Sequence, residues 1–302
     1  MKKRIIIAGG TGFIGKNLSA FFVAKKWEVC MITRGRSGIR NGVIWINWDE
    51  VEKWKSYLMN AELLINLTGK SVDCRYTAKN KQAILSSRIR ATNQLGKAIQ
   101  ALQHPPKVWM NASTATIYQS TYDQPNTEKS ERIGNDFSMT VAKKWEKAFF
   151  SYTLPKTRQI ALRISLVLGN NGGVLPVLKR HTKLGLGGHQ GNGLQQFAWI
   201  HIDDLLHAIW FLYQSELSGV VNCTVPQQIN NREFNAALRK VLNKSRGLNT
   251  PVWLLHLACF FLRTEPELIL KSRMVYPERL INNGFKFQYH TINQALNHLI
   301  KS

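Results

Sequence analysis

The feature that most restricts the fold of this chain is a glycine-rich turn near its amino terminus. A short apolar stretch, Arg4–Ala8, is followed by Gly9-Gly10-Thr11-Gly12-Phe13-Ile14-Gly15 and then by an amphipathic pattern over residues 13–26. In such a turn the first glycine permits a tight backbone, the second lets amides approach a pyrophosphate, and the third brings the helix close to the strand. The free N–H groups and the dipole of the helix favour an anion there. We therefore expect a dinucleotide to bind at Gly9, Thr11, Gly12, Phe13, Ile14 and Gly15.

The first 225 residues alternate short apolar stretches with longer amphipathic ones. Strands that alternate with helices predict crossover units and a parallel sheet. We expect an α/β fold: a doubly wound parallel-sheet Rossmann domain over residues 1–225, with a substrate-side insertion near 171–196, and a smaller, mainly helical C-terminal substrate domain over 226–302. Helices are predicted at 13–26, 79–103 and 136–152, and strands at Arg4–Ala8, Glu28–Thr33, Val43–Ile46, Glu62–Leu67, Lys107–Ala112, Arg158–Ile164 and Val220–Cys223.

The end of the second predicted strand indicates which dinucleotide binds. A cofactor with a free 2′-hydroxyl calls for Asp or Glu at this point, but the chain has Thr33, Arg34 and Arg36. A guanidinium binds a 2′-phosphate through paired, charge-assisted hydrogen bonds. The sequence therefore predicts NADP(H) rather than NAD(H). Asp49, just past the third strand, contacts the adenine edge or caps the following helix, and both readings stay open.

The charge of the chain is unusual, with 41 Lys and Arg against 18 Asp and Glu and a net charge of +23. Such a chain attracts anions, but the basic residues are scattered, which favours a broad basic surface over a dedicated nucleic-acid footprint. The longest nearly apolar run, Val252–Leu262, is shorter than the ~20 residues that span a bilayer, so we expect no membrane partner. Four single cysteines, Cys30, Cys74, Cys223 and Cys259, suit a reducing compartment, and we predict a cytoplasmic protein without a metal site.

Beyond the glycine turn, the sequence resembles the extended short-chain dehydrogenase/reductases, which include nucleotide-sugar epimerases and dehydratases. Two segments carry this resemblance, Asn66–Gly69 and Ala112–Tyr118. The chain is most similar to an atypical branch of that group, the YfcH-like epimerase family proteins. The marks of this branch lie at residues 69–77 (GKSVDCRYT), 87–92, 127–128, 145–146, 185–188, 199–205, 273–280 and 284–287.

The resemblance implies a cofactor-binding domain with a substrate domain beside it, and it extends the expected cofactor site. Further cofactor-binding residues implied by these segments are Leu67, Thr68, Gly69, Arg88, Ala112 and Ser113. Helices 79–103 and 136–152 correspond to the pair that forms dimers in related enzymes, so a homodimer is expected by analogy only.

The general acid or base of this superfamily, a Tyr-x-x-x-Lys pair on the fifth helix, is missing. With Glu146 as the reference position, the lysine site holds Ala142 and the tyrosine site holds Ser138. Residues 152–156 (YTLPK) fit the pattern literally, but Pro155 would break the helical turn that the pair requires. A proton-transferring group contributes about 10²–10⁴-fold, so substitutes matter. The candidate catalytic residues are Thr114, which matches the catalytic Ser/Thr of the superfamily, Tyr118 and Ser138.

Other polar residues are candidates for binding a substrate. Arg75 and Tyr76 belong to the branch-specific stretch, Arg163 ends the sixth strand, and Glu128 and His201 lie in loops beside the expected site. We expect an NADP(H)-binding epimerase or oxidoreductase that acts on a small, anionic molecule. The alternative is a non-catalytic NADP(H)-binding sensor or scaffold, which would explain Ser138 and Ala142. A third reading, a nucleic-acid-binding protein, rests on the net charge alone.

Overall fold

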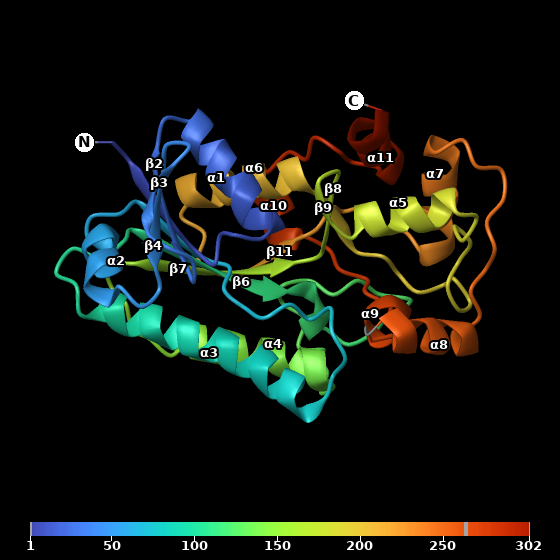
Figure 1. The fold of residues 1–302 in the computed structure, drawn as a ribbon, viewed down its shortest axis with the longest axis horizontal. Helices are drawn as coiled ribbons and strands as arrows, with labels where there is room; N and C mark the ends of the chain where they lie inside the picture. The colour runs from blue at the N-terminus through green and yellow to red at the C-terminus, as the bar shows by residue number, and fades with distance from the viewer. Residues whose placement is uncertain (1, 263–264, 302) are drawn as a thin grey trace.

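The computed structural model describes residues 2–262 and 265–301, and within it the side chain of Cys259 lies outside the described residues. Its centre is an eight-stranded sheet with the order β11-β7-β6-β5-β1-β2-β4-β3 (Figure 1). All neighbours are parallel except β3 and β4. The strands are β1 (Arg4–Ala8), β2 (Glu28–Thr33), β3 (Gly38–Arg40), β4 (Val43–Asn47), β5 (Leu63–Asn66), β6 (Val108–Thr114), β7 (Arg158–Ile164) and β11 (Gly219–Cys223).

Helices cover both faces of this sheet, which confirms the predicted doubly wound α/β fold. Alternate side chains of β1 point to opposite faces: Ile5 and Ile7 join one apolar cluster, and Ile6 and Ala8 join another. One face packs against α1 (Phe13–Ala24) and α6 (Ile202–Gln214). The other packs against α2 (Val51–Leu58), α3 (Ala78–Gln100) and α4 (Phe137–Phe150).

One strand of the central sheet and three strands outside it were not expected from the sequence. The edge strand β3 is short and exposed, so it lacks the apolar pattern that marks a strand. A separate three-stranded sheet, β10-β8-β9, follows the end of β7 and leads to α5 (Leu175–Lys183). Its strands β8 (Leu166–Gly169), β9 (Gly172–Gly173) and β10 (Trp199–His201) are too short for a periodic signal.

The predicted strands were seven, and each is present within one or two residues of its expected bounds, because a buried parallel strand is a continuous apolar run. The strands that the pattern missed are β3, β8, β9 and β10. The predicted insertion near 171–196 therefore contains β9 and α5 and is closed by β10.

The remainder of the chain is mostly helical. Helix α7 (Asn231–Val241) begins with the expected capping box, in which Asn230 accepts from the Glu233 N–H and the Glu233 side chain accepts from the Asn230 N–H. Helix α11 (Ile292–Lys301) packs on α7. The other helices are η1 (Ala115–Ile117), α8 (Val252–Leu262), α9 (Glu267–Leu270), α10 (Glu278–Asn282) and α11 (Ile292–Lys301). Among the described residues, no helix is both long and apolar enough to cross a bilayer.

Candidate cofactor and active site

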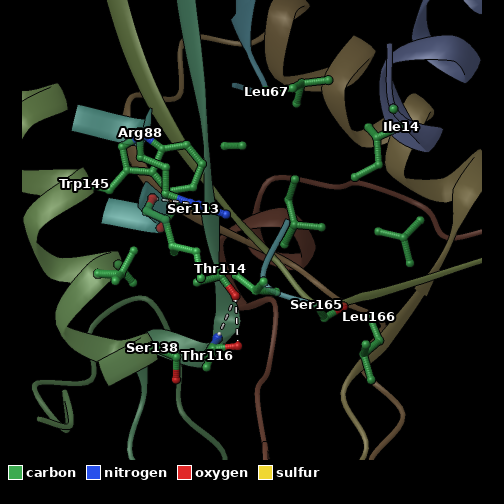
Figure 2. Close-up of a pocket in the computed structure, with 18 of the residues that line it drawn as sticks. Ile14, Leu67, Arg88, Ser113, Thr114, Thr116, Ser138, Trp145, Ser165 and Leu166 are labelled. Carbon is green, nitrogen blue, oxygen red and sulfur yellow. Dashed lines mark hydrogen bonds between the residues drawn. The ribbon is translucent and has the colours of Figure 1, made fainter. Parts of the chain in front are cut away.

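A cavity of about 460 Å³ opens at the carboxyl ends of β1, β5, β6 and β7 (Figure 2). The strand order reverses between β1 and β5, and ligands in open α/β sheets bind outside the strand ends at such a point. The glycine turn forms one wall, helices α3 and α4 form another, and β8 and β9 complete it. Most of the lining is apolar, and its side-chain polar groups belong to Tyr76, Arg88, Ser113, Thr114, Thr116, Ser138, Trp145 and Ser165.

The glycine turn has the close contacts that the sequence pattern predicts. Gly9 has φ +77°, and a Cβ there would lie 2.8 Å from the Thr68 backbone. A Cβ on Gly15 would lie 2.4 Å from the Gly10 backbone, so only glycine lets α1 approach this closely. Gly12 is the N-cap of α1, carries no side-chain cap and faces open space. The N–H groups of the first turn therefore remain available, and the turn fits a pyrophosphate.

The residues expected to select NADP(H) lie at the end of β2, beside this turn. The Gly9 N–H donates to the Ile32 carbonyl (2.9 Å), so the turn and the strand end are held together. Thr33 is buried and its Oγ1 accepts from the Gly35 N–H (3.2 Å). Arg34 and Arg36 are exposed, and no described carboxylate forms an ion pair with either.

Two other predicted cofactor residues are exposed. Thr11 lies at the tip of the glycine turn and does not line the cavity. Asp49 donates its backbone N–H to Asn47 Oδ1 (2.8 Å). It does not cap α2, whose N-cap is Glu50 without a side-chain cap bond, so the helix-cap reading of Asp49 is not what the structure shows.

The segment after β5 lies across from the glycine turn. Leu67 lines the cavity, and the Thr68 hydroxyl and N–H both bond to Asn66 Oδ1 (2.5 and 3.0 Å). A Cβ on Gly69 would lie 2.9 Å from the Arg88 guanidinium carbon, so Gly69 makes room for Arg88. These contacts fix the position of residues 66–69 relative to α3.

Arg88 is a half-buried cation on the cavity wall. Its Nη1 donates to the carbonyls of Lys70 (3.0 Å) and Ile84 (2.9 Å), and its guanidinium carbon lies 5.0 Å from the Trp145 ring centroid. Among the described residues no carboxylate pairs with it. Burial lowers the pKa of Arg88 to about 10, and the nearby Tyr76 opposes this. A guanidinium at this pKa stays charged at neutral pH, so it is available to an anion in the cavity.

The end of β6 presents the next candidates. Ala112, Ser113 and Thr114 all line the cavity. Thr114 Oγ1 lies 3.0 Å from the Thr116 hydroxyl and accepts from the Thr116 N–H (3.1 Å), as Figure 2 shows. The Thr114 hydroxyl thus sits at the cavity surface on a fixed 3₁₀ turn.

Behind Thr114 lies a buried polar network that explains two of the predicted functional residues. Ser113 donates to Glu146 Oε1 (2.5 Å), and Arg163 donates to both Glu146 oxygens (2.9 and 2.7 Å). Arg163 also donates to the Tyr118 hydroxyl (2.7 Å), which donates to Asn222 Oδ1 (2.8 Å). Tyr118 and Arg163 do not line the cavity. Their polar groups bond within the protein and join β6, α4, β7 and β11.

Titration of this network follows from its burial and its charge pairing. Burial raises the pKa of Tyr118, although Arg163 beside it acts in the opposite direction. For Arg163 burial is unfavourable to the charge, but the bonds to Glu146 outweigh it and raise the pKa. Tyr118 is therefore neutral and Arg163 charged at any ordinary pH.

Ser138 lines the cavity from the first turn of α4, at the position where the superfamily has its tyrosine. Its Oγ lies 2.5 Å from Glu267 Oε1 and 3.0 Å from Asp136 Oδ1. Lys271 forms ion pairs with both carboxylates, at 2.8 Å to Glu267. The sequence did not point to Glu267 or Lys271, because no local pattern relates them to Ser138, which is 129 positions from Glu267.

The structure also shows where Ala142, at the lysine position, and Tyr152 lie. Ala142 is fully buried and lines the cavity, so no ammonium group stands at the lysine site. Tyr152 lies beyond the end of α4 and packs against α3, where its hydroxyl donates to the Asn93 carbonyl (3.1 Å). Residues 152 and 156 therefore do not form the superfamily pair.

Tyr76 is the predicted substrate residue that reaches the cavity. Its ring packs edge to face on Phe137, with centroids 4.8 Å apart, and its N–H donates to Glu265 Oε1 (2.6 Å). The hydroxyl is buried and has no hydrogen-bond partner among the described residues. Burial raises the pKa of Tyr76, so this hydroxyl is a neutral donor. Arg75 is half-buried and does not line the cavity.

Glu128 and His201 lie away from the cavity. Glu128 accepts from the N–H groups of Asn222 (2.9 Å) and Arg279 (3.4 Å), which joins the C-terminal segment to the sheet edge. His201 is fully buried and is the N-cap of α6, with Nδ1 accepting from the Asp203 N–H (3.0 Å). Its Nε2 lies 3.1 Å from His298 Nδ1.

The cluster around His201 has the spacing of a metal site, with ligand atoms of His201, Asp203 and His298 within 4.8 Å of one another. Because Nδ1 accepts a backbone N–H, the proton of neutral His201 is on Nε2, which donates to His298. Hydrogen bonds thus use both ring nitrogens of His201. The sequence showed no such spacing, since His201 and His298 are 97 residues apart.

Comparisons with known proteins agree with this geometry. Residues 5–224 match the family model described as NAD dependent epimerase/dehydratase family, and residues 250–299 match a domain of unknown function, DUF1731. The chain belongs to the NAD dependent epimerase/dehydratase family. It is 31% identical over 299 residues to the epimerase family protein YfhF of Bacillus subtilis, covering 98% of this chain and 97% of YfhF.

Solved structures extend the comparison. The human epimerase family protein SDR39U1 (isoform 2), solved with NADPH, superposes with a TM-score of 0.90 at 29% identity over 99% of each chain. Thermus thermophilus UDP-glucose 4-epimerase, solved with NAD, superposes with a TM-score of 0.75 at 14% identity over 98% of each chain, which shows a shared fold alone. The resemblance to the YfcH-like branch of extended short-chain dehydrogenase/reductases is confirmed.

The buried Glu146–Arg163 pair gives a first prediction. Glu146→Gln keeps the shape of the side chain but leaves the Arg163 charge without a counterion, which costs about 3 kcal/mol of unfolding free energy. Urea unfolding measures this loss. The control is Glu52→Gln, because Glu52 is 87% exposed in its pair with Lys55 and such pairs contribute less than about 1 kcal/mol. Equal losses in the two variants would contradict the structural role of the network.

His201 gives a second prediction, on pH. Burial, followed by the neighbouring His298, lowers the pKa of His201 from 6.5 to about 3. The unfolded chain then binds a proton that the folded chain does not, so stability present above pH 6.5 is lost as the pH falls. Unfolding free energy should drop by about 2 kcal/mol from pH 7 to pH 5 through this residue. His201→Asn keeps an N-cap acceptor, and its urea-unfolding curves should lose that part of the pH dependence; an unchanged slope would refute it.

Proposed function

We propose that this protein is an NADP(H)-dependent epimerase or oxidoreductase that acts on a small anionic molecule. The observation that carries the proposal is the uncapped N-terminus of α1 at Gly12, which opens directly onto the cavity between β1 and β5. Such a terminus binds the pyrophosphate of a dinucleotide. When bound, the nicotinamide supplies the acceptor or donor of a hydride.

The residues that would hold the dinucleotide follow from their positions. The N–H groups of residues 13–15 receive the pyrophosphate, and Arg34 and Arg36 receive the 2′-phosphate at the end of β2. The superposed structures include one solved with NADPH and one solved with NAD, so the choice between the two cofactors rests on this chain's own arginines. Leu67, Thr68 and Gly69 would support the cofactor from the opposite side.

The substrate would occupy the part of the cavity between α3 and α4. Among the residues that the structure describes, no carboxylate pairs with Arg88 and no group bonds to the buried Tyr76 hydroxyl. An anionic group could pair with the Arg88 charge and accept a hydrogen bond from the Tyr76 hydroxyl, and a buried donor without an acceptor costs free energy. This supports a substrate that carries a carboxylate or a phosphate.

Proton transfer would use hydroxyl groups in place of the superfamily's tyrosine and lysine. Thr114 is placed to polarise a carbonyl or hydroxyl of the substrate from the end of β6. Ser138, at the tyrosine position, lies 2.5 Å from Glu267. As hydride leaves the substrate carbon that bears a hydroxyl, the hydroxyl proton would pass to the Ser138 oxygen while the Ser138 proton passes to the Glu267 carboxylate, which Lys271 holds in position. Glu267 and Lys271 belong to the C-terminal part, which we separate at residue 226.

The alternative is a non-catalytic NADP(H)-binding sensor. Ala142 favours it, because α4 lacks the lysine that the superfamily places one turn after its tyrosine to lower the pKa of that group. Both readings predict cofactor binding, and only the first predicts turnover.

Cofactor binding is tested by thermal shift. A ligand at a hundredfold excess over its Kd stabilises the folded state by about 2.7 kcal/mol, so NADPH should raise the melting temperature and NADH should raise it less. Each charge-assisted hydrogen bond to the 2′-phosphate contributes about 1.5–3 kcal/mol. Arg34→Ala should therefore reduce the preference for NADPH about tenfold or more.

The control for that variant is Arg40→Ala. Arg40 is exposed on the neighbouring β3, and its guanidinium carbon lies 5.5 Å from the Trp45 ring centroid. It should keep the wild-type preference. If neither dinucleotide shifts the melting temperature of the wild type, the cofactor site itself is refuted.

Catalysis is tested by NADPH oxidation against a panel of small keto acids and sugar phosphates. Ser138→Ala should lower kcat about 10²–10⁴-fold and leave the NADPH thermal shift intact. Ser165→Ala is the matched control, because Ser165 also lines the cavity but its hydroxyl donates to the Cys223 carbonyl (2.9 Å). NADPH binding without turnover of any panel member would favour the sensor.

A further inference from the structure

One end of the molecule exposes an unusual concentration of large apolar side chains. Of the fifteen large hydrophobic side chains that are exposed among the described residues, seven lie on two short segments, 184–186 and 248–257. The Trp253 side chain is 69% exposed, as is Leu248, and Leu184 is 67% exposed. We call these residues the apolar edge: Leu184, Leu186, Leu248, Val252, Trp253, Leu254 and Leu257.

The two segments of the apolar edge are held side by side by the backbone. The Leu248 N–H donates to the Gly185 carbonyl (2.8 Å), and the Gly188 N–H donates to the Leu248 carbonyl (3.1 Å). The Thr250 N–H donates to the His189 carbonyl (2.9 Å). The second segment continues into the first half of α8, which lies at the periphery of the molecule beyond α9 (Figure 1). The seven residues of the apolar edge therefore lie on two segments that are neighbours in space.

The two chain segments that carry the apolar edge are basic, and the nearest acidic residues in the sequence are Asp203, Glu233 and Glu265. Residues 170–202 and 234–262, which include both segments with α5 and most of α7, contain seven Lys and Arg and no Asp or Glu. Exposed members of this set are Arg180, Lys183, Lys240, Lys244 and Arg246. This local excess adds to a chain that carries +23 overall.

Exposed Trp and Leu side chains, on segments that contain Lys and Arg but no Asp or Glu, have the composition of a surface that lies in a membrane interface. We propose that the apolar edge docks the protein on the surface of a bilayer that contains anionic lipid. Trp253, Leu248 and Leu257 enter the boundary between headgroups and acyl chains, while the basic residues contact the lipid phosphates. This differs from the sequence expectation of no membrane partner, which considered only spanning segments.

Other occupants fit this edge less well. A second copy of the chain, related by a two-fold axis, would bring two clusters of seven positive charges together. Nucleic acid would be attracted by the charge, but apart from Trp253 the apolar side chains are aliphatic and offer no ring on which bases stack. An anionic bilayer would attract the basic residues and would also bury the aliphatic side chains.

Co-sedimentation of the full chain with sucrose-loaded vesicles tests the proposal. Vesicles of phosphatidylcholine with phosphatidylglycerol should bind at least about tenfold more protein than phosphatidylcholine alone, and high salt should weaken the binding. Trp253→Ser combined with Leu257→Ser should abolish it. The matched control combines Tyr122→Ser with Phe150→Ser, two exposed apolar residues elsewhere, and should bind as the wild type does.

A second pair of variants tests the charge. Lys183→Glu, Lys244→Glu and Arg246→Glu together should abolish binding to the anionic vesicles. The control reverses three exposed lysines of α3 and α4, Lys97, Lys144 and Lys147, and so changes the net charge equally. Far-ultraviolet circular dichroism and the thermal shift with NADPH show that each variant is folded.

Three results would overturn the proposal. The first is no binding to vesicles, or equal binding to neutral and anionic ones. The second is a wild-type dimer by light scattering that becomes monomeric in the Trp253/Leu257 variant while vesicles do not bind, which would assign the edge to a second copy. The third is binding of single-stranded RNA that competes with vesicles and survives loss of Trp253 and Leu257, which would assign it to nucleic acid.

Discussion

The bidentate bond between Arg163 and Glu146 is the interaction on which the active end of this fold depends. Both side chains are buried, so the free-energy cost of removing each charge from water is offset only by the attraction of the other. The pair connects β7 to α4, and through Ser113 and Tyr118 it extends to β6 and β11. Thr114 follows Ser113 directly, so the position of the cavity hydroxyl is set by an ion pair that never touches the cavity.

The same arrangement explains why polar residues at strand ends misled the sequence analysis. Arg163 and Tyr118 were sensible candidates, because ligands of open α/β sheets lie at that edge. Their partners are Glu146 and Asn222, and the second is 104 residues from Tyr118. One signal was present in the sequence: a glutamate on the predicted helix 136–152 that needs a cation once it is buried. Single-sequence patterns report periodicity along the chain, and they do not report which charges meet across it.

The glycine turn and the parallel sheet were predicted for the opposite reason. Their signals are local: a continuous apolar strand, glycines at fixed spacing, and a helix that begins at once. Glu267 and Lys271 had no comparable signal, because they reach Ser138 only when the C-terminal part folds over α4. The small sheet β10-β8-β9 was missed for yet another reason, since strands of two to four residues are too short to show a period.

Residues from the dinucleotide-binding part and from the C-terminal part of the chain thus meet at the cavity. The Tyr76 backbone is bonded to Glu265, 189 residues later, and Ser138 is bonded to Glu267. By contrast, the close contacts of Gly9, Gly10 and Gly15 in the glycine turn lie within the first 68 residues. An exchange of the segment around residues 265–273 during evolution would therefore alter the groups that meet the substrate while the dinucleotide half kept its contacts. Relatives of this chain can diverge in what they recognise without first having to rebuild how they bind a nucleotide.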